Sequence, residues 1–327
     1  MAVPLRKRLK RWVRAQVLRA LALPISALPL GPALALGAFV GRAAFLLAGR
    51  ERARMLEHLA IAFPEKSLEE RRALARASLV HLGQVAMEIA TLRRNARDLE
   101  RYVSLAPGAE EVVRRAHARG RGLVFVAGHI GNWELLALRL ARIVQPGAVV
   151  ARHTSQPWLD RAMQRARAEF GFETLWREDP GTARGLLRLF RRGGGLGILI
   201  DQDTRVDGVY APFFGRLAHT PRAAADLALR FGAPVLVTTS HRRGPRPGQG
   251  HEIEVTELPF DPQPPDREAE VLRLTRAAVA AQEAAIRRYP TEWVWMHRRW
   301  KTRPPGDPGL EGPLARSMPK SRELSEI

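Results

Sequence analysis

The sequence predicts an α/β protein with a mostly parallel mixed sheet flanked by helices, preceded by a helical, membrane-associated N-terminal segment. From residue 119 on, short apolar runs alternate with stretches of helical spacing, which is typical of a parallel sheet with crossover helices. Residues 50–118 read as helical throughout. Before them, a charge-free run of 22 residues from Ala20 to Gly41 follows a basic N-terminus.

The first 50 residues admit three interpretations. Their apolar run has the length of a membrane span, which needs about 20 residues, but Pro24, Pro29 and Pro32 interrupt it, and prolines kink or break helices. A kinked anchor or interfacial hairpin with a cytoplasmic basic flank fits this pattern best. A signal peptide cleaved after Ala33-Leu-Ala35 and a buried helix pair are the alternatives.

One domain is predicted over residues 51–305, with a helical part at 51–118 and an α/β core at 119–305. In the helical part, one apolar face runs up to Pro64 and consists of Leu56, Leu59, Ala60 and Phe63. Ser67-Leu-Glu-Glu70 is a capping-box pattern that begins a helix ending near Leu92. The tail 306–327, rich in proline, glycine and charge, is expected to be flexible.

Strands and helices alternate through the core. Strands are predicted at 122–127, 147–151, 172–176, 195–200, 234–240 and 252–257, and helices at 132–143, 157–169, 181–192, 221–231 and 267–288. Thr220 is predicted to cap the helix that Pro221 begins, and Gly232 to end it. The run Gly193–Gly197 precedes its strand, which indicates a helix-ending turn and not a phosphate-binding loop.

Composition narrows the classes of function. The net charge is +20, but arginine is spread along the chain, aromatic residues make up only 6%, and no zinc-finger or RNA-recognition motif occurs. An anionic membrane surface, a phosphorylated substrate or an acidic protein partner explains the charge as well as nucleic acid does. The chain has no cysteine, which excludes disulfides, thiolate metal sites and a cysteine nucleophile.

The most informative stretch joins a buried strand to a helix. Apolar residues 123–127 run into Gly128-His129, and Glu134 follows in the first turns of the next helix. A carboxylate there can reach back to the imidazole and fix its tautomer for general-base catalysis. Chance alone gives about one His-x4-acid spacing in a chain of this composition, so the placement at a strand–helix junction carries the argument.

Other candidates lie at strand ends. Asp201 and Asp203 end the strand before them and are expected to face the rim that carries His129, although helix caps or solvated loop acids are the simpler interpretation. Arg152 follows another strand, and Arg167 lies on the next helix; either could hold a phosphate or an oxyanion, or belong to a solvated face. No second histidine lies at metal-ligand spacing from His129, and neither metal nor cofactor is expected.

Two aromatic stretches complete the pattern. Phe213-Phe214 is expected to pack in the core. Residues 289–303 hold three tryptophans and four basic residues besides His297, which suits either a membrane interface with an anionic headgroup or packing with cations at the surface.

Taken together, these stretches resemble the lipid A biosynthesis acyltransferases, the late lauroyl or myristoyl transferases of the lysophospholipid acyltransferase superfamily. The resemblance runs from about residue 5 to Pro305. It rests on an ordered set of motifs, Arg52-Ala-Arg-Met-Leu-Glu-His-Leu-Ala-Ile-Ala-Phe-Pro64, Gly128-His-Ile-Gly-Asn-Trp-Glu134, Asp201-Gln-Asp203, Phe213-Phe-Gly215 and Glu292-Trp-Val-Trp-Met-His-Arg-Arg-Trp-Lys-Thr-Arg-Pro304. Family members more often carry asparagine in place of His58, and the wider superfamily often has asparagine in place of Gly128.

The resemblance implies the roles of the site residues. His129 and Glu134 match the catalytic dyad, Asp201 matches a required aspartate, and Arg167, with Arg165 as a rival, matches a required arginine. The candidate substrate-binding or oxyanion residues are Arg152, Arg167, Asp201, Asp203 and Asn132.

The resemblance also implies the partners. The donor would be acyl-acyl carrier protein, the acceptor an anionic glycolipid of the lipid A precursor type, and the place the cytoplasmic face of the bacterial inner membrane, with no nucleic acid involved. Another glycolipid or lysophospholipid acceptor is the first alternative. A basic membrane- or nucleic-acid-binding protein without activity is the more distant one.

Overall fold

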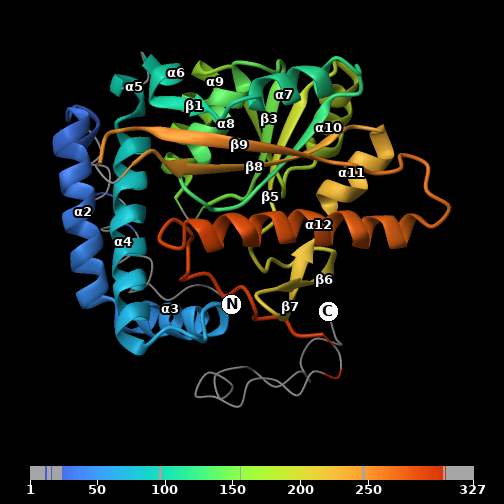
Figure 1. Ribbon diagram of the computed structural model, residues 1–327. Coiled ribbons are helices and arrows are strands. Elements are labelled where there is room, and N and C mark those ends of the chain that lie inside the picture. The colour runs from blue at the N-terminus through green and yellow to red at the C-terminus, as the bar shows by residue number, and fades with distance from the viewer. Residues whose placement is uncertain are drawn as a thin grey trace.

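The computed structural model describes residues 12, 16, 24–95, 98–154, 156–244, 247–304 and 306. A seven-stranded sheet forms its centre (Figure 1). From one edge to the other the strands are β1 (Val103–Leu105), β9 (His251–Leu258), β8 (Val235–Arg242), β2 (Leu123–Ala127), β5 (Gly195–Leu199), β3 (Gly147–Ala151) and β4 (Phe172–Trp176). All neighbours pair in parallel except β8 and β9. The predicted mostly parallel mixed sheet is therefore confirmed.

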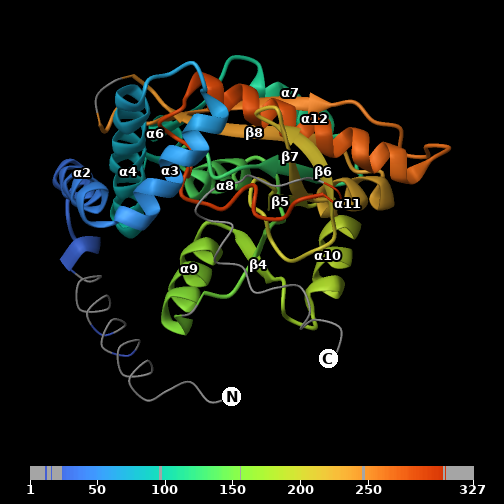
Figure 2. The same cartoon turned by 90° about the horizontal axis from the view of Figure 1, so that it is seen from below.

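Helices cover both faces of the sheet and bury two apolar clusters against it (Figures 1 and 2). One face carries α7 (Ala109–His117) and α8 (Trp133–Ala141), with α9 (Pro157–Glu169) beside β4. The other carries α10 (Thr182–Arg191), α11 (Ala223–Phe231) and α12 (Arg267–Arg288). Each predicted core strand and helix is present within a few residues of its expected bounds, because its apolar residues repeat at the spacing of its secondary structure.

The prediction for Thr220 and Pro221 is wrong. Both belong to β7 (Arg216–Pro221), which pairs with β6 (Gly208–Phe213) in a separate hairpin, and α11 begins only at Ala223 with Arg222 as its cap residue. The hairpin turns at Phe214 and Gly215, both with positive φ, which is the backbone of a two-residue hairpin turn. Gly232 does end α11 in the left-handed conformation, as predicted.

The helical part contains α3 (Gly49–Ala62), α4 (Leu68–Ala90) and the short helices α5 (Leu92–Asn95) and α6 (Leu99–Tyr102). The capping box forms as predicted, because Ser67 and Glu70 each accept the other's backbone N–H. Uniform helix over 50–118 is wrong at β1, a three-residue strand that pairs with β9 at the sheet edge. A strand of three residues is too short to show the alternation of apolar and polar residues that predicts a strand.

Before these helices, α2 (Leu30–Leu47) packs side by side with α4 (Figures 1 and 2). Backbones touch where Gly37 and Gly41 meet α4: a Cβ on Gly37 would lie 2.4 Å from the carbonyl oxygen of Gly83. Pro29 is the cap residue and Pro32 lies in the first turn, where proline is tolerated, so neither breaks the helix.

Among the described helices, α2 is long and apolar enough to cross a membrane by length and composition. Its outer face exposes large apolar side chains, namely Phe39, Val40, Leu46 and Leu47. The start of the predicted apolar run, residues 20–23, lies outside the described residues, as does the predicted tail apart from residue 306.

Candidate active site

A cavity of about 400 Å³ lies between the sheet and helices α8 and α9. Its walls are apolar because of a local feature of the sequence. In the parallel register Gly195 of β5 pairs with Gly147 of β3, and Gly197 pairs with Phe125 of β2, so three glycines share the sheet face toward α8. Small residues of α8, Ala137 and Ala141, line the opposite side. The missing side chains leave the space that a ligand of this volume needs.

The polar end of the cavity is the carboxyl edge of the sheet, and His129 lies there. His129 occupies the turn between β2 and α8. The close packing of this turn requires its two glycines, Gly128 and Gly131. Gly131 has φ +61°, and a Cβ on it would lie 2.0 Å from the carbonyl oxygen of Ser240. A Cβ on Gly128 would approach the Asp201 carboxyl group to 3.2 Å, which accounts for glycine at this position.

Asp201 is the carboxylate that holds the imidazole of His129. Its Oδ1 is 2.8 Å from Nδ1, and its Oδ2 accepts the His129 backbone N–H at 2.7 Å and the Trp293 indole N–H at 2.8 Å. Burial alone would raise the pKa of Asp201, but the charge of His129 and these hydrogen bonds outweigh burial and hold that pKa well below its usual range. An ionised partner at Nδ1 keeps the proton there and leaves Nε2 as the basic nitrogen.

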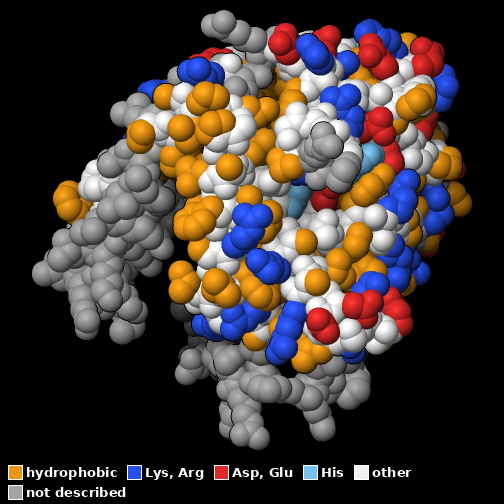
Figure 3. All heavy atoms as spheres, turned by 60° about the vertical axis from the view of Figure 1, so that its left-hand side comes forward, with side chains coloured by type: hydrophobic (Ala, Val, Ile, Leu, Met, Phe, Trp, Pro, Cys, Tyr) orange, Lys and Arg blue, Asp and Glu red, His pale blue; other side chains and the backbone are white. Residues whose placement is uncertain are grey.

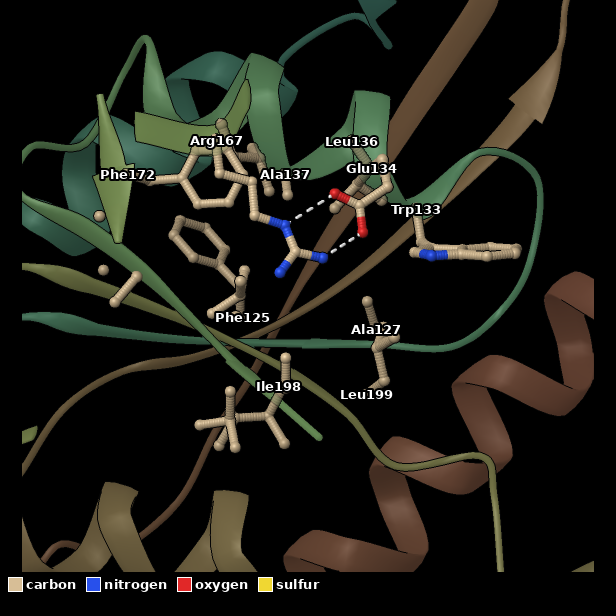
Figure 4. A pocket seen from close by; sticks show the side chains of 18 of the residues that line it. Phe125, Ala127, Trp133, Glu134, Leu136, Ala137, Arg167, Phe172, Ile198 and Leu199 are labelled. Atoms are coloured by element: carbon tan, nitrogen blue, oxygen red, sulfur yellow. Dashed lines mark hydrogen bonds and ion pairs between the residues drawn. The ribbon is translucent and has the colours of Figure 1, made fainter. Parts of the chain in front are cut away.

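Glu134 makes a different pair from the one expected. Its carboxylate binds Arg167 of α9 in bidentate fashion, with Nε 3.0 Å from Oε2 and Nη2 on Oε1 (Figure 4). Arg167 Nη1 also donates to the Thr174 hydroxyl. The expectation that Glu134 fixes the imidazole is therefore corrected, because Asp201 does so. Both members of the Glu134–Arg167 pair line the cavity. Arg165 is exposed and Arg167 is buried, which separates the two rival arginines.

Two residues that the sequence did not single out complete the rim. The Gln202 side chain lies against His129 and His297, with its amide nitrogen within 3.1 Å of ring nitrogens of both. The rings of the two histidines stand edge to face, 5.1 Å apart. Both residues lie inside motifs that the sequence displays, Asp201-Gln-Asp203 and the tryptophan-rich segment, but no spacing rule joins positions 202 and 297.

The remaining candidates lie around this centre. Asn132 is buried; its Oδ1 caps α8 through the N–H of Leu135, and its Nδ2 donates to Glu88 of α4. Asp203 accepts hydrogen bonds from the backbone and hydroxyl of Thr302. Arg152 lines the cavity mouth with its side chain 75% exposed, 3.6 Å from Glu178. Of these three residues, only Arg152 places a positive charge in contact with solvent at the cavity mouth.

Glu88 joins the helical part to the site. It accepts hydrogen bonds from Tyr102, Asn132 and Arg242 and contacts His251, and these charges and donors hold its pKa well below the usual range despite burial. Through Asn132 this buried carboxylate fixes the first turn of α8, which carries Glu134. Within the described residues, no group of three or more His, Asp or Glu side chains is placed to hold a metal ion.

The tryptophan-rich segment packs inside the protein. Trp293 and Trp295 are fully buried and Trp300 nearly so, which favours packing over a membrane interface. Trp293 forms a bridge with Ile130, and the Glu292 carbonyl accepts the N–H of Gly131. The segment thus holds the turn that carries His129 in place through contacts with Ile130 and Gly131. From outside, histidine side chains are visible among acidic, apolar and basic side chains (Figure 3).

Comparison with known proteins identifies the family to which the sequence is similar. Residues 4–302 match a family model described as bacterial lipid A biosynthesis acyltransferase. The chain is 28% identical to the lipid A biosynthesis lauroyltransferase of Escherichia coli K12 over 84% of this chain and 86% of that protein. It is 25% identical to the palmitoleoyltransferase of the same organism over 84% and 87%. A phosphatidylinositol mannoside acyltransferase of Mycolicibacterium smegmatis is 26% identical over 55% of this chain and 57% of that protein.

Proposed function

Since this chain belongs to the family of bacterial lipid A biosynthesis acyltransferases, we propose that it moves a fatty acyl chain from acyl-acyl carrier protein to a hydroxyl of a lipid A precursor. One observation carries the proposal. A histidine whose Nδ1 is held by a buried carboxylate lies at the mouth of an apolar cavity, so a base and a space for an acyl chain meet at one point.

In the proposed reaction, Nε2 of His129 takes the proton of the acceptor hydroxyl as its oxygen attacks the thioester carbonyl carbon. The carbon–sulfur bond then breaks, and the imidazolium returns the proton to the departing thiolate. Asp201 stabilises the imidazolium between these steps. General-base help is typically worth about 10²–10⁴-fold, so positioning and charge stabilisation supply the rest. The thioester is already activated, and the scheme requires neither cofactor nor metal.

Glu134 and Arg167 are proposed to act as a unit. The bidentate pair holds a guanidinium group against the cavity wall near the reacting carbonyl, where it stabilises developing negative charge. Arg152, exposed at the mouth, is proposed to contact a phosphate of donor or acceptor. Asn132 and Asp203 are proposed to position this machinery, since the first caps α8 and the second holds the segment that follows His297.

The site of action is proposed to be the cytoplasmic face of the bacterial inner membrane. The exposed apolar face of α2 supports membrane attachment, because such a face gains free energy on entering the lipid boundary. The excess of positive charge suits both an anionic lipid surface and an acidic carrier protein. Since α2 packs on α4, attachment through α2 would bring the catalytic domain with it.

The test is mass spectrometry of lipids after expression in a bacterial strain that lacks its own late acyltransferases. We expect a lipid A precursor heavier by one acyl chain, and no such product with His129→Ala. His117→Ala is the matched control, because His117 lies on α7 and contacts Gly193, which precedes β5. Transfer to an added mannosylated phosphoinositide, and not to the lipid A precursor, would move the acceptor to the class named for the Mycolicibacterium smegmatis relative. An unchanged product with His129→Ala would contradict the assignment of the base.

A further inference from the structure

Gln202 directly follows the carboxylate that orients His129, and its amide lies at the cavity mouth. The amide nitrogen is 3.0 Å from Nε2 and 3.1 Å from Nδ1 of His129. Because these two distances are almost equal, the amide lies over the face of the imidazole and not in line with either lone pair. Asp201 occupies the in-plane position at Nδ1, so the in-plane lone pair of Nε2 stays available to a substrate hydroxyl.

His297 holds this amide in place. Its Nε2 is 3.1 Å from the Gln202 amide nitrogen, and its Nδ1 has no hydrogen-bond partner among the described residues. Burial first, and then the nearby His129, lower the pKa of His297 to about 4, so its ring is neutral near pH 7 and can accept a hydrogen bond. One N–H of the amide is thereby fixed on His297, and the second is left for an acceptor beside the base.

The position of that second N–H matches the needs of acyl transfer. An acceptor hydroxyl on Nε2 of His129 has its oxygen about 2.8 Å from that nitrogen, and it attacks a carbonyl carbon about 3 Å away. The carbonyl oxygen then lies within a few ångströms of an amide already 3.0 Å from the same Nε2. No substrate group needs to displace the bond to His297.

We propose that Gln202 is a further catalytic residue, which donates its side-chain N–H to the carbonyl oxygen of the acyl donor as that oxygen becomes an oxyanion. As the hydroxyl adds to the carbonyl carbon, the π electrons move to the oxygen and meet this donor. When the oxyanion collapses, they return and the thiolate leaves with the proton that His129 carries. The inference rests on the proposed acyl transfer and assigns one component of its site.

The test compares purified full-length Gln202→Ala and Gln202→Glu with the unsubstituted protein. Loss of one oxyanion donor typically lowers kcat by about 10²–10³-fold, and we expect this for both variants with the KM for the donor changed less than about threefold. For Gln202→Ala, which adds no charge beside His129, the pH profile of kcat should keep its midpoint, because a donor to the oxyanion does not set the basicity of His129. Gln164→Ala, on the exposed side of α9, is the matched control with unchanged kcat.

Binding of two donor analogues separates catalysis from structure. A trifluoromethyl ketone analogue adds water or a hydroxyl to become tetrahedral, whereas a thioether analogue carries no carbonyl. Gln202→Ala should weaken the first by about 10²-fold and leave the second within about threefold. Binding can be measured only on folded protein. If Gln202→Ala does not fold, Gln202→Met takes its place, because methionine keeps the length of the side chain and lacks the N–H donor.

Three results would overturn the inference: kcat retained within threefold, a shifted pH midpoint that accounts for the lost rate, or equal weakening of both analogues. Absence of acyl transfer by the unsubstituted protein would instead refute the proposed function. Transfer by the unsubstituted protein at a rate that Gln202→Ala matches would refute only the role of Gln202.

Discussion

The rim of the cavity and its interior are built in opposite ways. At the rim, side chains from segments far apart in the sequence are fixed by short hydrogen bonds, as where Asp201 joins His129 and Trp293. In the interior, the decisive feature is the lack of side chains at Gly147, Gly195 and Gly197. From this difference we expect the rim to determine how fast the proposed reaction proceeds and the interior to determine which acyl chain takes part.

Breaking the rim at Asp201 should have the largest effect. In Asp201→Asn the shape is kept, but an amide oxygen replaces the charge that stabilises the imidazolium, and an amide nitrogen at Nδ1 would favour the wrong tautomer of His129. We expect kcat to fall by about 10³–10⁴-fold, as for other carboxylate–histidine pairs, with little change in the KM for the donor. Steady-state kinetics with an acyl thioester measure this.

Asp207→Asn is the control for that variant, because Asp207 lies in the same loop with an exposed side chain. Its rate should match that of the unsubstituted protein. If Asp201→Asn retained more than a tenth of kcat, the carboxylate that matters would have to be sought elsewhere, with Glu134 as the first candidate.

The second pair of the rim should respond differently. Removing one partner of the buried pair Glu134–Arg167 leaves an uncompensated charge, which typically costs about 3–5 kcal/mol of stability. We expect Arg167→Met and Glu134→Gln each to lower the free energy of unfolding, and the double variant to lose less than the sum of both. Urea unfolding measures all four proteins.

Activity then separates the two pairs. If Glu134 acts through Arg167, Glu134→Gln and Arg167→Met should lower kcat by similar factors, and the double variant should be no slower than either. A double variant that multiplies the two losses would show that Glu134 and Arg167 act independently, which contradicts the proposed unit.

The contrast between rim and interior also explains which parts of the site the sequence predicts. The strands and helices that form the cavity wall follow from local apolar periodicity, and the edge that carries His129 and Asp201 follows from the rule that ligands bind at the carboxyl ends of parallel strands. Which carboxylate meets which partner depends on side-chain directions across elements. Local spacing therefore assigns Glu134 to a histidine five residues away, whereas its partner Arg167 comes from another helix.

Long-range support of the rim was the least predictable part. Trp293 and His297 reach the site only because the segment after α12 returns beneath the His129 turn and forms a bridge at Ile130. Tryptophan and arginine in that segment fit a membrane interface and a packed core equally well by composition, and only burial distinguishes them. The alternation of strands and helices does not predict the hairpin of β6 and β7, because its strands form a separate small sheet.

A change in the interior should alter the choice of substrate and leave the chemistry intact. Ala141 lines the cavity together with Val144 and Gly147, away from His129. Ala141→Phe should exclude the end of a long acyl chain, at about 0.8 kcal/mol per methylene group that stays in water. In competition assays with donors of mixed length, we expect the preferred chain to become shorter by a few carbons, with kcat for the short donor kept within about threefold.

Phe172→Leu is the opposing variant, because Phe172 lines the same part of the cavity and its ring would be removed. Its preference should move to longer chains. If both variants lowered kcat equally for all chain lengths, the interior would affect the rate of the reaction and not the choice of acyl chain. That result would contradict the proposed division of roles between rim and interior.

The smallest expected effect is the change in the free energy of unfolding with pH. It should come from titratable side chains on the rim side, because the interior of the cavity is apolar. Burial lowers the pKa of His58 and His297 to about 4 and that of His81 to about 3. A histidine with a lowered pKa in the fold contributes stability that is present above about pH 6.5 and lost as the pH falls toward 4. Each such group changes the free energy of unfolding by at most about 1.4 kcal/mol per pH unit.

Glu292 opposes this trend, because burial raises its pKa to about 7. Its contribution is present at low pH and is lost as the pH rises from about 4.5 through 7. Glu292→Gln removes the opposing group while keeping an acceptor for the Arg242 N–H. In urea unfolding between pH 5 and 8, the variant should be more stable than the unsubstituted protein at pH 8, by about 1–3 kcal/mol. It should also lose stability more steeply toward pH 5. Parallel curves would mean that Glu292 is ionised in the fold across this range and that the charge beneath the His129 turn is compensated by Arg242.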